Sequence, residues 1–276
     1  MLKSPVKTLI ACGQFSPVAK NLSANAALMR GQAHEAAACG ASIIVFPELC
    51  LTGYLTPDEV PPLSVGLRSE EIGRLAETAR HAGISLCFGF AERAPDGRLF
   101  NSMAFIGKDG GLKAVYRKVH LWEGESRWAA AGDGFSCFDA GQFRAGMAIC
   151  YDMRFPETAR ALALQGATAV LAASAWLGPA DEWELVLRAR AVDNGMFVAG
   201  AALQGSYREL AFHGTSAIVS PHGVVIARAG EGRDEVIAAC YDSEEVGAFR
   251  ARLPLLRHRR TSSYGPLDAA GDWPGS

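Results

Sequence analysis

Short apolar segments alternate with segments of helical periodicity along most of the chain. Apolar runs bounded by turn-forming residues predict strands, whereas Ala- and Leu-rich stretches with capping residues predict helices. We expect strands at residues 8–14, 42–47, 84–90, 101–107, 112–117, 144–150, 169–173, 197–202, 216–220, 224–227 and 235–241. We expect helices at residues 21–39, 69–81, 156–165 and 181–194.

These elements indicate a single α/β domain. Residues 108–111 and 221–223 have the composition of hairpin turns, and no Pro- or Ser-rich linker interrupts the pattern. Strands that are apolar throughout are buried on both faces, so a sheet of such strands needs a covering layer on each side. We therefore expect one domain over residues 1–265 and an irregular polar tail over residues 266–276.

The composition argues against several classes of function. The chain has 276 residues, of which 49% are hydrophobic, and its formal net charge is −2. No basic block indicates a nucleic-acid partner. Apolar stretches such as residues 167–177 are too short to cross a bilayer, and the first ten residues do not resemble a signal peptide. We therefore expect a cytoplasmic protein without a membrane partner.

Cysteine and glycine usage narrows the chemistry further. The seven cysteines are odd in number and form no CxxC pair, which argues against a disulfide framework and a zinc cluster. The Gly-rich segments at 132–134 and 230–232 lack the strand–turn–helix setting of a phosphate-binding loop. We expect no metal and no cofactor, with most cysteines buried as small apolar side chains.

Two charged residues stand where predicted strands end. Glu48 follows the apolar run 43–47. Burial there would raise the pKa of its carboxyl group and make it a usable general base, and the alternative is a surface-loop glutamate. The ammonium group of Lys118, after strand 112–117, could stabilise an oxyanion, although solvent-facing strand lysines are commoner. We expect His120 to be a structural residue.

Cys150 ends another apolar strand, shortly before Pro156 begins a helix. A strand–turn–helix arrangement can expose a side chain at the turn and aim backbone N–H groups at it, as in a nucleophile elbow. A helix N-terminus and a nearby cation would also favour the thiolate. The alternative is one more buried cysteine.

The segments around these residues resemble the three motifs of the nitrilase superfamily of carbon–nitrogen hydrolases. Residues 46–54 read FPELCLTGY, residues 116–121 read YRKVHL, and residues 149–157 read ICYDMRFPE. The motifs occur in the family's order, and the resemblance extends from residue 8 to about residue 265. It implies a four-layer α-β-β-α sandwich that pairs into homodimers or larger homo-oligomers.

The resemblance also implies catalytic roles. Cys150 would attack a carbonyl carbon to form a thioester, and Glu48 would transfer the protons. Lys118 and the backbone N–H of Tyr151 would hold the oxyanion. These roles agree with those expected from the residues themselves, since a thiol needs an adjacent base and an oxyanion needs fixed donors.

A second glutamate often follows the lysine motif in this family. Glu125 fits that position better than Glu123, because residues 120–133 then match the related pattern HLWDREKLWFTPGD without a gap. Three alanines at 129–131 replace the usual F-T-P, so the loop can differ locally. We include Glu125 in the catalytic set.

The residues after the cysteine favour the amidase branch. Nitrile-cleaving members usually read CWE and carbamoylases CNDRRWPE or CWDQWFPE, whereas residues 150–155 read CYDMRF. ω-Amidases resemble this text but continue the lysine motif as HLFD, where residues 120–123 read HLWE. We expect hydrolysis of a small linear carboxamide to an acid and ammonia. N-carbamoyl or nitrile hydrolysis, a Cys–His thiol enzyme and a non-catalytic binding protein are the alternatives.

Four further residues are candidates for the substrate pocket. Tyr54 and Trp176 follow the glutamate motif and a strand end, and Trp122 follows the lysine motif. Arg154 could bind a substrate carboxylate through paired hydrogen bonds or form an internal salt bridge near the turn. Each aromatic side chain could equally pack in the core.

The helices at 156–165 and around 181–194 would supply the homodimer interface that the resemblance implies. Leu162, Leu164, Leu185 and Leu187 lie on these helices and could face either a partner or the core.

Overall fold

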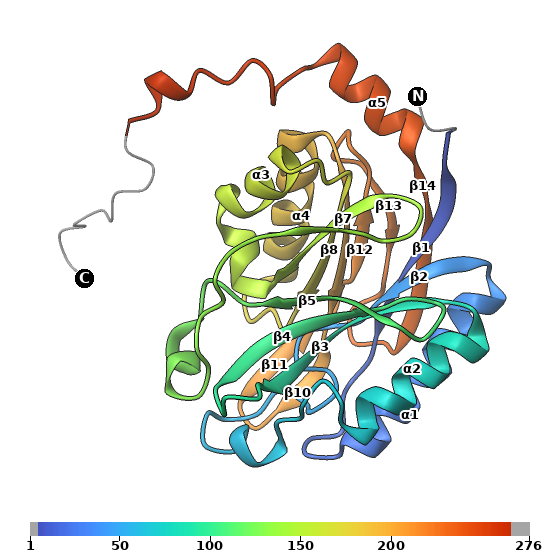
Figure 1. Ribbon diagram of the computed structural model, residues 1–276, viewed down its shortest axis with the longest axis vertical. Helices are drawn as coiled ribbons and strands as arrows, with labels where there is room; N and C mark the ends of the chain where they lie inside the picture. The colour runs from blue at the N-terminus through green and yellow to red at the C-terminus, as the bar shows by residue number, and fades with distance from the viewer. Residues whose placement is uncertain (1–4, 266–276) are drawn as a thin grey trace.

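Two six-stranded sheets form the centre of the molecule in the computed structural model, which describes residues 5–265 (Figure 1). In spatial order, the first sheet contains β14 (Glu235–Asp242), β1 (Lys7–Gln14), β2 (Ala41–Val45), β3 (Ser85–Arg93), β4 (Leu99–Ile106) and β5 (Leu112–Arg117). The second contains β13 (Val225–Arg228), β12 (Ala217–Val219), β9 (Phe197–Ala202), β8 (Ala169–Ser174), β7 (Arg144–Ile149) and β6 (Cys137–Asp139).

Helices cover the outer face of each sheet. The helices are α1 (Leu22–Ala38), α2 (Glu70–Ala82), α3 (Pro156–Leu164), α4 (Ala180–Asn194) and α5 (Ser243–Arg252). Helices α1 and α2 pack on the first sheet, and α3 and α4 pack on the second (Figure 1). A third apolar core, which includes Val45, Met103, Met147 and Leu171, lies between the two sheets. The predicted four-layer α-β-β-α sandwich is confirmed.

The residues that were predicted to begin or end helices do so in the structure. The Ser69 side chain accepts a hydrogen bond from the Ile72 backbone N–H at 3.4 Å and caps α2. Gly83 and Gly195 end α2 and α4 with φ values of 68° and 56°, which a residue without a Cβ adopts at little cost. Pro156 occupies the first position of α3.

Several short or weakly patterned elements were not predicted. They are strand β6, the hairpin of β10 (Gln204–Tyr207) and β11 (Leu210–His213), and helix α5. In α5 only Val246 and Phe249 are buried, so its apolar periodicity is too sparse to stand out. The predicted tail at residues 266–276 lies outside the described residues.

The leucines considered for a homodimer interface divide into two groups. Leu162 and Leu187 are fully buried in the core beneath α3 and α4, so neither can face a partner. Leu164 and Leu185 are 47% and 64% exposed, respectively, which leaves them available at the outer surface. No helix within residues 5–265 is both long and apolar enough to span a membrane.

Gly89 in β3 supports the segment that carries Glu48. A Cβ atom at this position would lie 2.6 Å from the backbone atoms Leu49 N and Pro47 O and 2.7 Å from Glu48 Cα. The two chain segments are also joined by a hydrogen bond from Gly89 N to Pro47 O at 3.2 Å. The position of Glu48 therefore depends on the absence of a side chain at residue 89.

We expect Gly89→Ala to lower the free energy of unfolding in urea by about 1–3 kcal/mol, because the extra methyl group forces backbone apart. Gly73→Ala is the matched control. Gly73 is exposed in α2 with nothing within 4 Å of the added methyl, so that variant should gain about 0.5–1 kcal/mol. Equal stability of Gly89→Ala and the parent would contradict the close contact.

Candidate active site

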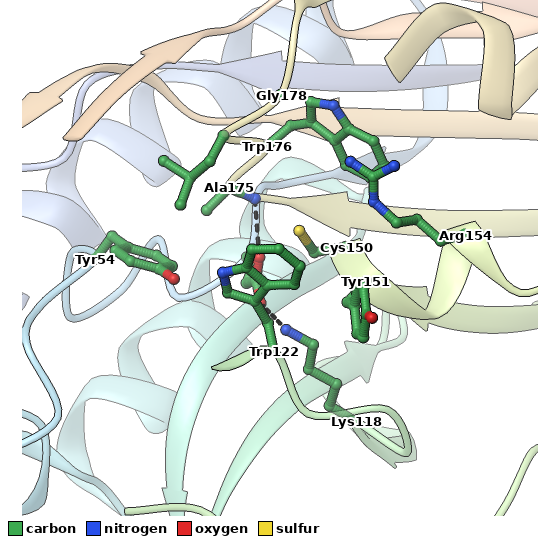
Figure 2. A pocket seen from close by; sticks show the side chains of 11 residues that line it. Tyr54, Lys118, Trp122, Cys150, Tyr151, Arg154, Ala175, Trp176 and Gly178 are labelled. Atoms are coloured by element: carbon green, nitrogen blue, oxygen red, sulfur yellow. Dashed lines mark hydrogen bonds and ion pairs between the residues drawn. The ribbon is translucent and has the colours of Figure 1, made fainter. Parts of the chain in front are cut away.

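Strand ends from both sheets bring the predicted catalytic residues together. Glu48 follows β2 and Lys118 follows β5 in the first sheet, whereas Cys150 follows β7 in the second. All three line a cavity of about 180 Å³ (Figure 2). The other lining residues are Tyr54, Trp122, Tyr151, Arg154, Ala175, Trp176, Leu177 and Gly178.

A buried lysine joins two buried carboxylates. Lys118 Nζ lies 2.8 Å from Glu48 Oε1 and 2.7 Å from Glu125 Oε2. The side chains of Lys118 and Glu48 are 1% exposed and that of Glu125 is 6% exposed. The surface-loop alternative for Glu48 and the solvent-facing alternative for Lys118 are therefore wrong. The structure also brings Glu125 into the same cluster.

Burial and neighbouring charges shift the pKa values of Lys118 and Glu125 in opposite directions. Burial favours a neutral lysine, but the two carboxylates outweigh it and raise the pKa of Lys118 well above its usual value. Burial raises the pKa of Glu125, while Lys118 opposes that shift. Lys118 is thus an ammonium ion at neutral pH, and the two glutamates share its single positive charge.

Asn101 and Ala175 also hold the two carboxylates, and sequence reasoning missed both. Asn101 Nδ2 donates to Glu48 Oε1 at 2.7 Å and to Glu125 Oε1 at 2.8 Å. The backbone N–H of Ala175 donates to Glu48 Oε2 at 2.8 Å. The available signal for Asn101 was a polar amide in a strand that is apolar apart from Ser102. A backbone donor such as Ala175 leaves no signal in the sequence.

Cys150 lies at a strained turn, as a nucleophile elbow requires. Its φ is +45°, a left-handed conformation that is costly for a residue with a side chain. Burial and the negative charge of Glu48 raise the pKa of its thiol, and Lys118 lowers it. The thiol is therefore protonated in the resting site, next to a carboxylate that can accept its proton.

Ser174 is a further neighbour of Cys150 that the sequence did not reveal. Strands β7 and β8 are parallel with Ile149 opposite Ala173, so Cys150 and Ser174 occupy the next positions along them. Ser174 is fully buried, and its hydroxyl lowers the pKa of the Cys150 thiol. Its Oγ has no hydrogen-bond partner within residues 5–265.

Asp152 fixes the turn and the lysine segment relative to each other. One of its oxygens accepts from the Tyr116 hydroxyl at 2.6 Å and from Ile149 N at 3.0 Å. The other lies 2.9 Å from both His120 N and His120 Nδ1. His120 also stacks on Phe155 at 3.7 Å between ring centroids. These contacts give His120 a structural role and do not support a Cys–His mechanism.

The comparisons agree with this geometry. The carbon-nitrogen hydrolase family model matches residues 9–251. The chain belongs to the carbon–nitrogen hydrolase family. It is 34% identical to the ω-amidase NIT2 of Homo sapiens, over 83% of this chain and 87% of that protein. Nit3 of Saccharomyces cerevisiae, a member of branch 10 of the nitrilase superfamily, superposes with a TM-score of 0.84 at 30% identity, covering 92% and 97% of the two chains.

A further structural relative of this hydrolase contains a bound amide. It is a double mutant of the amidase from Nesterenkonia sp. AN1 in complex with acrylamide. The two structures superpose with a TM-score of 0.82 at 26% identity, over 92% of this chain and 95% of that one. The similarity therefore extends over most of both chains.

The aromatic candidates of the hydrolase line its cavity. Figure 2 shows Tyr54, Trp122 and Tyr151 around the space in front of Cys150. The rings of Trp122 and Tyr151 meet edge to face at 4.9 Å, and burial raises the pKa of Tyr54. Tyr151 is the second residue of a 3-10 helix at Cys150–Arg154. Its backbone N–H is therefore a first-turn donor that the helix itself leaves unpaired.

Arg154 lines the cavity but is already paired. Its Nη1 and Nη2 atoms donate to the two carboxylate oxygens of Glu182 at 2.7 and 2.9 Å. Its guanidinium carbon lies 4.4 Å from the centroid of the Trp176 ring. The internal salt bridge, one of the two alternatives from the sequence, is the one that forms. Within the described part of the chain, no group of three or more His, Cys, Asp or Glu side chains could hold a metal ion.

We expect Asn101→Leu to lower the free energy of unfolding by about 2–4 kcal/mol at neutral pH, because two charged carboxylates lose a donor. Burial already raises the pKa of Glu125, and loss of this donor should raise it further in the folded variant. Its deficit should therefore shrink as the pH falls from neutral toward about 5. Urea unfolding at several pH values measures both effects.

Asn25→Leu provides the matched control for this prediction. Asn25 is fully buried in α1, but its side chain bonds only to the backbone of Val18 and Leu51. Its substitution should cost stability by an amount that does not change over this pH range. The same pH independence in Asn101→Leu would refute the proposed support of the Glu125 carboxylate.

Proposed function

We propose that this hydrolase converts a small linear carboxamide to the carboxylic acid and ammonia, with Cys150 as the nucleophile. The decisive observation is the arrangement of Glu48, Lys118 and Cys150 around one cavity of about 180 Å³. The volume is suited to a short acyl group. The names of the relatives support the reaction class, since they include an ω-amidase and an amidase crystallised with acrylamide.

The first half of the reaction forms a thioester. Glu48 takes the proton from the Cys150 thiol as the sulfur attacks the amide carbon. The carbonyl oxygen becomes an oxyanion, which Lys118 and the backbone N–H of Tyr151 stabilise. When the tetrahedral intermediate collapses, the C–N bond breaks, Glu48 returns the proton to nitrogen, and ammonia leaves.

The second half hydrolyses the thioester. Glu48 takes a proton from a water molecule, which attacks the thioester carbon and regenerates the oxyanion in the same place. Collapse breaks the C–S bond, the acid is released, and the proton on Glu48 returns to the Cys150 sulfur. Glu125 does not transfer the proton in this scheme, but it and Glu48 hold the Lys118 ammonium between them.

The assembly and location of the enzyme are part of the same proposal. The exposed Leu164 and Leu185 on α3 and α4 support a homodimer or larger homo-oligomer formed through these helices. The seven cysteines are all free thiols, which supports a reducing cytoplasm. N-carbamoyl and nitrile hydrolysis would use the same residues, Glu48, Lys118 and Cys150. The assay therefore has to include substrates that distinguish these reactions.

We expect Cys150→Ala to lower ammonia release from acetamide, propionamide and butyramide by roughly 10⁴-fold or more, because the covalent route is lost. Intact-mass spectra of the parent should show an acyl adduct that Cys150→Ala lacks. Cys39→Ala, which removes an exposed free thiol, is the matched control and should retain full activity.

The same assay includes N-carbamoyl-β-alanine and propionitrile. Ammonia release from these compounds alone would overturn the choice of carboxamides while preserving the mechanism. An active Cys150→Ala variant would overturn the assignment of the nucleophile. Absence of both turnover and adduct over the whole panel would favour a binding protein that keeps the fold.

A further inference from the structure

Both cationic side chains that line the cavity are neutralised by carboxylates of the protein. Lys118 is held between Glu48 and Glu125 at 2.8 and 2.7 Å. Arg154, on the opposite wall, is held by Glu182. A substrate that carries an ionised carboxylate therefore meets no cation in the cavity lining that lacks a protein counter-ion.

Three separate contacts fix Glu182 in this position. Its carboxylate accepts two hydrogen bonds from Arg154, at 2.7 and 2.9 Å. It also accepts a hydrogen bond from Trp176 Nε1 at 3.2 Å. Since Arg154 stacks over the Trp176 ring, these three side chains form one closed unit at the cavity wall (Figure 2 shows Arg154 over Trp176). We call this unit the Arg154–Trp176–Glu182 wall.

The backbone is adapted to this wall. A Cβ at Gly178 would collide with Glu182 Oε2 and would lie 2.8 Å from Trp176 Nε1 and 3.4 Å from Arg154 Nη2. The absence of a side chain at Gly178 thus leaves space for the Glu182 carboxylate. Glu182 lies in the first turn of α4, where the helix dipole stabilises negative charge. The Arg154 guanidinium also lowers the pKa of Glu182, so the carboxylate is ionised at neutral pH.

We propose that Glu182 is a specificity-determining residue. It pairs with Arg154 and so keeps Arg154 from pairing with a substrate carboxylate, and the enzyme therefore prefers carboxamides with an uncharged acyl chain. Glu182 already neutralises Arg154 and occupies the paired N–H groups of its two terminal nitrogens. A substrate carboxylate therefore has either to displace Glu182 from two charge-assisted hydrogen bonds or to bind a remaining N–H beside a carboxylate that repels it. The rest of this side of the cavity is Ala175, Trp176 and Leu177, which suits an aliphatic chain. The inference rests on the amidase function proposed above.

Butyramide and succinamate form a matched pair of substrates. They have the same carboxamide and the same number of carbons, but succinamate ends in a carboxylate where butyramide ends in a methyl group. We expect the parent enzyme to have a kcat/KM for butyramide at least roughly 10-fold above that for succinamate, the equivalent of one charge-assisted hydrogen bond.

Glu182→Gln should reverse much of this preference. Glutamine keeps the shape of the side chain and removes its charge, so Arg154 can pair with the substrate. We expect kcat/KM for succinamate to rise roughly 10- to 100-fold, mainly through a lower KM, while butyramide changes less than about threefold. Adding Arg154→Gln to this variant should abolish the gain.

Glu184→Gln is the control on the same helix. Glu184 pairs with Arg188 and Arg228, outside the cavity lining, so its substitution should leave both substrates unchanged. A parent enzyme that prefers succinamate, or a Glu182→Gln variant that changes both substrates equally, would overturn the proposal. The first result would mean that Glu182 moves aside when an acidic substrate binds.

Binding to the Cys150→Ala background separates this proposal from the amidase function. Calorimetry should show that adding Glu182→Gln tightens succinamate binding by roughly 10-fold or more and leaves butyramide binding unchanged. If the parent hydrolyses neither compound, that result counts against the amidase proposal. The calorimetric result still decides the role of Glu182. Unchanged succinamate binding would overturn that role.

Discussion

The Lys118 ammonium, buried between Glu48 and Glu125, is the interaction on which the site depends. Removing one partner from such a cluster would leave an uncompensated buried charge, at a cost of about 3–5 kcal/mol. Two carboxyl groups face one ammonium group in this cluster. In the proposed mechanism Glu48 acts as the base while it stays paired with Lys118. In the proposed mechanism the lysine therefore supports both the base and the oxyanion.

Charge compensation extends from the floor of the cavity to its wall. The interior cluster is almost inaccessible to solvent, whereas the side chains of Arg154 and Glu182 are about a third exposed, at 36% and 34%. Solvent screens the outer pair, so its contribution to stability is small even though its effect on an approaching anion is direct. Charge interactions are thus strong in the buried Lys118 cluster and weak in the Arg154–Trp176–Glu182 wall. Substitutions in this wall should therefore cost little stability.

The sequence predicted the strand ends and the residues on them because both leave local signals. An apolar run followed by Glu48 or Cys150 can be recognised without knowing the fold, and the family resemblance supplies the pairing of these residues. Contacts between distant segments leave no such signal. Asn101, Ser174 and Glu182 each matter through a neighbour from another part of the chain. For the same reason Arg154 remained ambiguous, since only the structure brings its partner on α4 beside it.

The hydrogen bond from Ala175 N to Glu48 Oε2 crosses between the two sheets. The proposed general base therefore follows a strand of one sheet, while the proposed nucleophile and one of the base's own donors follow strands of the other. Neither half of the sandwich contains a working set of groups. The rate of turnover consequently depends on how closely the two sheets pack against each other. A slight separation of the sheets would abolish catalysis, even though the hydrogen bonds within each sheet stayed intact.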